Sequence, residues 1–241
     1  MTAISGVANC YKILSRPRPC TIVVAGLGRG EEMPVFRRCF RRARIIGVEP
    51  LHEHWRIVRR AGDRMPDVVV KRALWSTVGA RLTFHLNYEP DQRATVYELP
   101  RPVPGEETRE IETTTLDALF REYGPWRDGL LWLDCEGAEQ EILAASTSLA
   151  RAYRWINVEL TFCPARNVPP WQETDEVLRA AGFRLLAVHS AARNGRQTDG
   201  IYVRAAEWDK IRILSVESGI QRKLDRLAER SRRILRRRGE R

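Results

Sequence analysis

A glycine cluster that follows an apolar run constrains the fold of this chain most strongly. The run Ile22–Ala25 has the length and composition of a buried strand, and Gly26, Gly28 and Gly30 come directly after it. Glycine lets the backbone take left-handed conformations and approach a ligand where a Cβ would clash. A helix predicted to begin near Glu31 would present its free backbone N–H groups at the same place. The segment therefore predicts a strand, a ligand-binding turn and a helix in succession.

A second predicted strand, over residues 44–49, ends in an acidic residue, Glu49. In α/β folds that bind nucleotides, a carboxylate at this point accepts both hydroxyls of a ribose. The dinucleotide fingerprint requires a third glycine where this chain has Glu31, whose negative charge would face a pyrophosphate. This disfavours NAD and FAD. S-adenosylmethionine has no phosphate and carries a cationic sulfonium, so the two features together predict that the chain is an enzyme with an adenosine-containing cofactor.

Apolar and amphipathic runs alternate along the chain, which predicts an α/β domain with a mostly parallel sheet and helices on both faces. We expect strands near 21–25, 44–49, 67–72, 80–86, 130–135, 153–160, 183–189 and 199–204. We expect helices near 31–42, 52–61, 115–123, 137–149 and 173–181. Proline-rich stretches around 100–105 and 164–170 predict surface loops, because proline lacks a backbone donor and fixes φ.

Length and cysteine content favour an ordinary intracellular domain. The 241 residues suffice for one α/β domain with a short appendage. No run approaches the roughly eighteen apolar residues of a membrane span, and residues 1–20 lack the apolar stretch of a secretory signal. The five cysteines are scattered and never spaced as CxxC, a pattern typical of reduced thiols. We therefore expect a cytoplasmic protein, with peripheral membrane contact as an open alternative.

The net charge of +10 is concentrated at the C-terminal end. Residues 210–241 contain twelve Lys/Arg and four Asp/Glu, a net +8 that leaves +2 for the other 209 residues. An apolar stripe at helical spacing predicts an amphipathic helix there, so we divide the chain into an extension (1–20), a domain (21–208) and a basic helix (209–241). Three roles stay open for this helix: packing on the domain or a second copy, contact with an anionic membrane surface, or, less favoured for lack of interleaved aromatic residues, nucleic acid binding.

Acidic residues also follow two later strands. Asp134 comes directly after the run Leu130–Leu133, and Glu159 ends the run 155–158. Because neighbouring parallel strands end at one edge of a sheet, we expect both carboxylates to face one cleft. Such a pair can orient a hydroxyl, act as a base or hold a divalent metal ion, and the sequence leaves these alternatives, the metal included, undecided. His189 ends another predicted strand and is a candidate proton acceptor.

Four other residues have a structural interpretation. Glu139 is expected to stabilise a helix N-terminus through the helix dipole. We also expect structural roles for the three histidines that begin a helix or alternate on a strand, His52, His54 and His85.

Several blocks of the chain resemble, in order, those of the FkbM-type S-adenosylmethionine-dependent methyltransferases. The most specific is Leu133–Glu139, and Val48–Pro50 and Thr115–Leu119 precede it. Shorter matches are Ala73–Ser76, Asn157–Leu160 and Ala181–Phe183. The resemblance covers roughly residues 21–204. It implies a class I methyltransferase domain, with a Rossmann-like fold and a seven-stranded sheet, and transfer of a methyl group, usually to a hydroxyl of a sugar, glycan or small metabolite.

The resemblance also assigns residues to the two ligands. It implies that the methionine moiety is lined by Gly26, Gly28 and Gly30, that the ribose is bound by Glu49, and that the adenine lies near Trp75 and Ser76. It places Asp134 and Glu136 at the methyl-transfer cleft, where Asp134 is the expected base, with Glu159 or His189 as its partner.

One position departs from the family pattern. The family usually has an acid two residues before its first glycine, where it holds the methionine amino group, and this chain has Val24. Two consequences are open: the affinity for the cofactor is reduced, or Glu31 or Glu32 takes that role. Two alternatives to a small-molecule O-methyltransferase remain: a methyltransferase of RNA or protein, and a non-catalytic scaffold with a methyltransferase fold.

Overall fold

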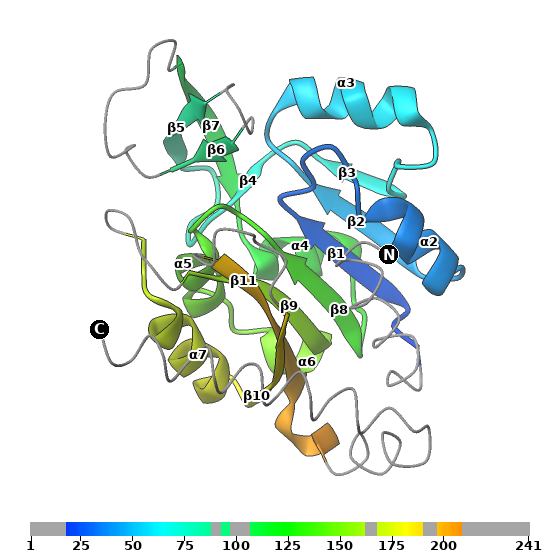
Figure 1. Cartoon of the computed structure of the whole chain (residues 1–241), viewed down its shortest axis with the longest axis vertical. Helices are drawn as coiled ribbons and strands as arrows, with labels where there is room; N and C mark the ends of the chain where they lie inside the picture. The colour runs from blue at the N-terminus through cyan, green and yellow to red at the C-terminus, as the bar shows by residue number, and fades with distance from the viewer. Residues whose placement is uncertain (1–17, 88–92, 97–106, 162–167, 190–196, 209–241) are drawn as a thin grey trace.

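A seven-stranded sheet forms the centre of the protein (Figure 1). The computed structural model describes residues 18–87, 93–96, 107–161, 168–189 and 197–208. The strand order is β10-β11-β9-β8-β1-β2-β3. The bounds are β1 (Thr21–Ala25), β2 (Arg44–Val48), β3 (Val68–Val70), β8 (Gly129–Leu133), β9 (Tyr153–Thr161), β10 (Phe183–His189) and β11 (Gln197–Arg204). Only β11 runs antiparallel to its neighbours within this sheet. The predicted mostly parallel, seven-stranded sheet is confirmed.

The order of the strands identifies the ligand-binding edge. Chain order reverses between β1 and β8, which lie side by side in the middle of the sheet. Open α/β sheets bind ligands at the carboxyl ends of the strands at such a reversal, because the connections leave in opposite directions and open a crevice. The turn after β1 and the loop after β8 are therefore the segments that can form a site.

Helices cover both faces of the sheet, as the run of fully buried residues in β1 and β8 requires. On one face, α2 (Met33–Cys39) and α3 (His52–Ala61) share a core with side chains such as Phe36 and Trp55. On the other face, the core includes side chains of α4 (Leu116–Tyr123), α5 (Glu139–Ala144), α6 (Leu149–Ala152) and α7 (Trp171–Ala180). A short 3-10 helix, η1 (Ala205–Glu207), follows the last strand.

A second, smaller sheet lies between β3 and α4 in the sequence and stands apart from the main sheet (Figure 1). It contains β4 (Ala73–Leu74), β5 (Arg81–Asn87), β6 (Arg93–Thr95) and β7 (Glu107–Thr114), in the order β4-β7-β5-β6. The strand predicted at 80–86 belongs to this sheet. Its apolar side chains alternate, and Phe84 and Leu86 pack with Ile111 in a separate small core. The alternation is typical of a half-buried antiparallel strand.

The single helix predicted over 137–149 is two helices, α5 and α6. A turn over residues 145–148 separates them, and Asp117 of α4 holds that turn. Its carboxylate accepts hydrogen bonds from the backbone N–H groups of Thr147 and Ser148 and from the hydroxyls of Ser146, Thr147 and Ser148. Serine and threonine hydroxyls compete with helical hydrogen bonds, which is why the helix ends here.

The predicted basic helix over 209–241 and most of the predicted extension lie outside the described residues. Those domain boundaries stay predictions. Among the described residues, no helix combines the length and the apolar character needed to cross a membrane.

Candidate functional site

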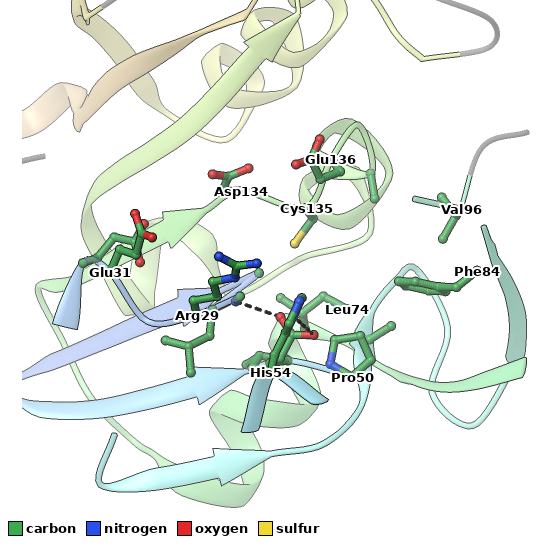
Figure 2. A pocket seen from close by; sticks show the side chains of 18 residues that line it. Arg29, Glu31, Pro50, His54, Leu74, Phe84, Val96, Asp134, Cys135 and Glu136 are labelled. Carbon is green, nitrogen blue, oxygen red and sulfur yellow. Dashed lines mark hydrogen bonds and ion pairs between the residues drawn. The ribbon is translucent and has the colours of Figure 1, made fainter. Parts of the chain in front are cut away.

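A cavity of about 390 Å³ opens at the carboxyl ends of β1, β2 and β8 (Figure 2). This volume lies within the range of roughly 300–1,000 Å³ that is typical of small-molecule sites. The lining residues come from the turn after β1, the end of β2, the small sheet and the loop after β8: Gly26, Leu27, Gly28, Arg29, Glu31, Glu32, Val48, Glu49, Pro50, His54, Ala73, Leu74, Phe84, Val96, Asp134, Cys135, Glu136 and Ala138.

The three predicted glycines have different surroundings. All have positive φ, of 73° at Gly26, 51° at Gly28 and 66° at Gly30. A Cβ on Gly26 would lie 1.6 Å from the carbonyl oxygen of Asp134, so this glycine is required where β1 and β8 leave the sheet together. A Cβ on Gly28 would meet nothing within 4 Å, because that position opens on the cavity. Gly30 lies against Arg64 and is not among the lining residues.

Glu49 lies at the centre of a hydrogen-bond network that joins three elements. Glu49 is 4% exposed, and its carboxylate accepts backbone hydrogen bonds from Gly28 at 2.8 Å and from Leu51 at 2.9 Å. His54 of α3 places its Nδ1 3.2 Å from the same carboxylate. The sequence predicts a structural role for His54, whereas the structure places it on the cavity beside Glu49. The position of His54 at the start of the helix that follows Glu49 is the signal that could have indicated this contact.

The two ends of the cavity differ in polarity (Figure 2). Phe84 and Val96 lie at one end, whereas Glu31 and Asp134 lie toward the other. The apolar end comes from the small sheet, which sequence reasoning did not connect with the site. The predicted adenine neighbours Trp75 and Ser76 follow β4 directly but do not line the cavity; Ala73 and Leu74 do.

The predicted substrate residue Glu136 lines the cavity, and its backbone is fixed by a sharp turn and by a hydrogen bond. Its φ of 51° is uncommon for a residue with a side chain, and it turns the chain sharply between β8 and α5. The hydroxyl of Thr95 in β6 donates a hydrogen bond to the Glu136 carbonyl oxygen at 3.1 Å. This contact ties the small sheet to the loop that carries Asp134.

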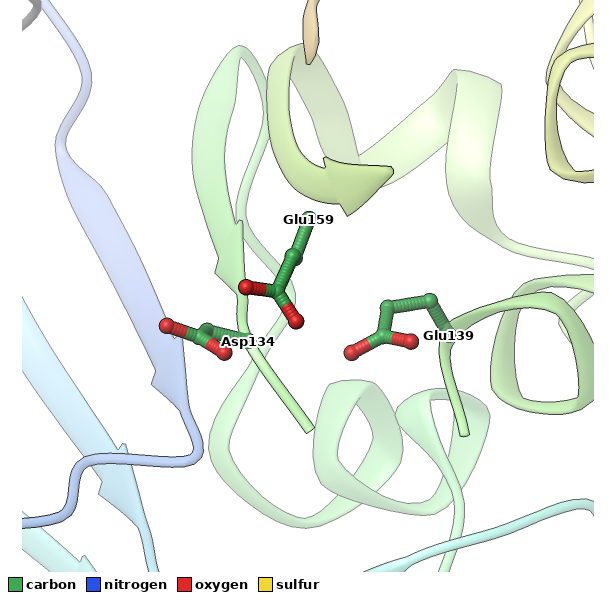
Figure 3. A group of neighbouring side chains, drawn as sticks. All are labelled: Asp134, Glu139 and Glu159. Atoms are coloured by element: carbon green, nitrogen blue, oxygen red, sulfur yellow. The ribbon is translucent and has the colours of Figure 1, made fainter. Parts of the chain in front are cut away.

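Asp134 and Glu159 meet as predicted, and a third carboxylate joins them (Figure 3). Oxygen atoms of Asp134, Glu139 and Glu159 lie within 4.8 Å of one another. Burial, with Asp134 nearby, raises the pKa of Glu159 well above its usual range. Burial likewise raises the pKa of Glu139 to about 8, although its carboxylate accepts a hydrogen bond from the Cys135 amide at 2.6 Å. Protons or a cation must therefore offset the negative charge of this cluster.

The cluster can act in either of two ways. Three carboxylates that converge on one point are the oxygen ligands that Mg²⁺ and Ca²⁺ prefer, so these residues could hold a divalent ion. Without an ion, a carboxylate among them can accept a proton from a hydroxyl. The loop after β8 brings Glu139 into the carboxylate cluster. The sequence predicts only a helix-dipole role for Glu139, so its place beside Asp134 and Glu159 is an addition from the structure.

Asp199 adds a further acid that sequence reasoning missed. In the antiparallel ladder it lies opposite Glu159 of β9 and opposite His189 of β10. Asn157 donates a hydrogen bond to Asp199 at 3.2 Å, and burial raises the Asp199 pKa to about 6. No local motif marks Asp199, because its place follows from strand pairing. The His189 side chain lies outside the described part of the chain, so its role stays a prediction.

A family profile decides the identity of the chain. The profile of the Methyltransferase FkbM domain matches residues 25–185, which is more than half of the sequence. The chain belongs to the FkbM methyltransferase family. The family predicted for this FkbM-family methyltransferase from its sequence is thus confirmed.

Solved structures agree on the fold. The FkbM-family chain resembles the magnesium protoporphyrin IX methyltransferase of Synechocystis, solved with bound S-adenosylmethionine, with a TM-score of 0.50 and 11% identity over 83% of this chain and 77% of that one. A methyltransferase FkbM from Methylobacillus flagellatus gives a TM-score of 0.46 and 10% identity over 76% of this chain and 43% of that one. At such identities the likeness concerns the fold alone. A comparison with curated protein sequences gave no match.

Proposed function

We propose that this FkbM-family chain transfers the methyl group of S-adenosylmethionine to a hydroxyl of a sugar, glycan or small metabolite. The observation that carries the proposal is the place of Glu49 in a cavity with one apolar and one acidic end. Adenine suits the surface formed by Leu74, Phe84 and Val96. The ribose hydroxyls would bind Glu49, and the methionine part, with its cationic groups, would lie toward the acids.

The proposed hydroxyl acceptor is assigned from the carboxylate cluster of Asp134, Glu139 and Glu159. S-adenosylmethionine supplies a methyl carbon that is already a strong electrophile, so the protein contributes mainly the position of the acceptor oxygen. Asp134 both lines the cavity and belongs to the carboxylate cluster, so it can face an acceptor bound between the two. As the new C–O bond forms and the S–C bond breaks, the hydroxyl proton would pass to Asp134. Glu159 would orient the acceptor.

A hydroxyl acceptor fits these residues because carboxylates both accept hydrogen bonds from hydroxyls and take up their protons. A non-catalytic scaffold is disfavoured. Burying Glu139 and Glu159 close together lowers the stability of the fold, and a scaffold does not need these carboxylates.

The experiment is to incubate the purified full chain with S-adenosylmethionine and a panel of sugars, glycans and small hydroxyl compounds, with and without Mg²⁺. Formation of S-adenosylhomocysteine, together with the mass gain of one methyl group on a hydroxyl compound, is the expected result, and Asp134→Asn is the matched control. Methylation found only on added RNA or protein would contradict the proposed acceptor class. If no acceptor is methylated, a non-catalytic scaffold would be favoured.

A further inference from the structure

The acidic end of the cavity contains a carboxylate that the proposed reaction does not use. Glu31, Glu32 and Asp134 all line this end, and the turn after β1 contributes one arginine, Arg29. Glu31 is exposed, whereas Glu32 is half-buried where the turn enters α2. Glu32 therefore combines access to the cavity with partial removal from water.

Among the residues that the structure describes, the Glu32 carboxylate has neither a capping hydrogen bond nor an ion pair. Its side chain makes no capping hydrogen bond to the first turn of α2. Within the part of the chain that the structure describes, no lysine, arginine or histidine forms an ion pair with it. By contrast, Asp67 and Glu53, two other acids near α2 and α3, are each paired with an arginine. The Glu32 carboxylate is available to a ligand in the cavity.

The electrostatic surroundings of Glu32 favour a positively charged ligand group. Burial raises the pKa of Glu32 to about 7, and the neighbouring negative charges of Asp134, Glu31 and Asp199 add to the rise. A cation placed beside such a carboxylate favours its ionised form and is itself bound more tightly. Arg29, the arginine on this part of the lining, is exposed.

The cofactor brings a suitable cation to this end. With adenine on the apolar surface and the ribose at Glu49, the methionine part continues toward the acidic end, and it carries an α-ammonium group at its tip. The strand position that would otherwise supply an acid holds Val24, which is 0% exposed in the core beneath α2 together with Phe36 and Trp132. No group of Val24 can reach a ligand.

We propose that the carboxylate of Glu32 binds the α-ammonium group of S-adenosylmethionine and so replaces the acid that is missing at position 24. This assignment rests on the proposed function in one respect: the cofactor lies in the cavity with its adenine on the apolar surface and its ribose at Glu49. Glu32 is a cofactor-binding residue: it contacts the methionine tip, while the acceptor side belongs to Asp134 and Glu159. Glu31 is the natural comparison, because it lines the same end but remains exposed.

The experiment compares two ligands that differ in the proposed contact. S-adenosylhomocysteine carries the α-ammonium, whereas 5′-methylthioadenosine has the same adenosine and sulfur but no amino acid part. Both are titrated calorimetrically into the full-length wild type, Glu32→Gln and Glu31→Gln, at a pH above the Glu32 pKa of about 7. Thermal melts establish that each variant is folded. If Glu32→Gln does not fold, Glu32→Asp, which keeps the charge but shortens the reach, takes its place.

The expected result is selective. A hydrogen bond to a charged group contributes about 1.5–3 kcal/mol, so Glu32→Gln should weaken S-adenosylhomocysteine binding by roughly 10- to 100-fold. The affinity for 5′-methylthioadenosine should stay within about twofold, and Glu31→Gln should change neither ligand by more than about threefold.

Three results would overturn the assignment. Equal losses for both ligands would show that Glu32 supports the cavity rather than the ammonium. Unchanged affinity for S-adenosylhomocysteine with reduced turnover would make Glu32 a proton acceptor instead. A larger loss in Glu31→Gln would move the role to that residue. In each of these cases the wild type still binds S-adenosylhomocysteine, so the proposed function stands. A wild type that binds neither ligand would refute both the proposed function and the assignment of Glu32.

Discussion

The Glu49 carboxylate accepts a hydrogen bond from the backbone N–H of Gly28 at 2.8 Å. This contact joins the end of β2 to the turn after β1, and the Leu51 amide holds the second carboxylate oxygen. A carboxylate has about four acceptor positions, so one on the Gly28-bound oxygen remains for a ribose hydroxyl. The two sequence features that most suggested a cofactor are therefore parts of one preformed surface.

Substituting alanine at Gly26 and at Gly28 should separate folding from binding. Gly26→Ala places a Cβ 1.6 Å from the Asp134 carbonyl oxygen, and we expect a loss of about 3 kcal/mol or more in the free energy of unfolding. Gly28→Ala has open space for its Cβ, so strain at positive φ should cost only about 1–2 kcal/mol, while the Cβ obstructs the cofactor and lowers its affinity at least tenfold. Urea denaturation and cofactor titration measure the two effects. Equal destabilisation of both variants would contradict this division.

Asp134→Asn should remove turnover and spare cofactor binding. The amide keeps the size of the side chain but cannot accept the hydroxyl proton, so we expect the rate to fall by about 10²- to 10⁴-fold. The affinity for S-adenosylhomocysteine should change by no more than about threefold. Glu112→Gln, an exposed acid on β7, is the control. Turnover that survives in Asp134→Asn would exclude this residue as the base.

Arg109 should act as a positioning residue for the adenine surface. It donates a hydrogen bond to Glu53 of α3 at 2.8 Å and so ties β7 to the helix that carries His54. Breaking this half-buried pair with Arg109→Met should loosen the small sheet and weaken cofactor binding by about fivefold, with little change in melting temperature or in the rate at saturation. Reversing the pair with Arg109→Glu and Glu53→Arg together should restore part of the affinity. Arg72→Met, which breaks the ion pair with Glu122, is the matched control, and an equal effect there would argue against a specific role.

Asp117 should stabilise the domain in a pH-dependent way. Burial opposes its ionisation, but hydrogen bonds from Ser148, Thr147 and Ser146 outweigh burial and hold the Asp117 pKa well below its usual value. A lowered carboxyl pKa contributes stability above the unfolded pKa of about 3.8, and that stability disappears as the pH falls through the folded pKa. Asp117→Asn should therefore cost about 1–2 kcal/mol near neutral pH and progressively less in acid.

Urea denaturation over a pH series checks this prediction, with Glu176→Gln, an exposed acid on α7, as the control. A difference between wild type and Asp117→Asn that stays constant into acid would show that the charge of Asp117 is not what stabilises the turn.

The central sheet and the ligand-binding edge could be predicted because their signals are local. β1 and β8 are uninterrupted apolar runs that must be buried on both faces, and each is followed by glycine or acid at the point where the chain leaves the sheet. Once the strands are taken as parallel, Glu49, Asp134 and Glu159 must come to one edge. The structure places them there.

The parts that could not be predicted depend on contacts between distant segments. β7 is largely polar, so its pairing with β5, the strand that carries Phe84, has no signature in the β7 sequence. Asp199 meets Glu159 only through the antiparallel register of β11. Glu139 reaches the carboxylate cluster because the backbone turns at Glu136 with a positive φ, which its residue type does not suggest.

The most direct measurement is a calorimetric titration of the full chain with S-adenosylmethionine, with NAD as the control ligand. The account predicts saturable binding of S-adenosylmethionine, no binding of NAD, and a loss of at least tenfold in affinity in Glu49→Ala but not in Glu112→Ala. The expected loss follows from about 1.5–3 kcal/mol for hydrogen bonds to a charged group. Absence of binding, or an affinity that Glu49→Ala leaves unchanged, would contradict the assignment of this cavity to the cofactor.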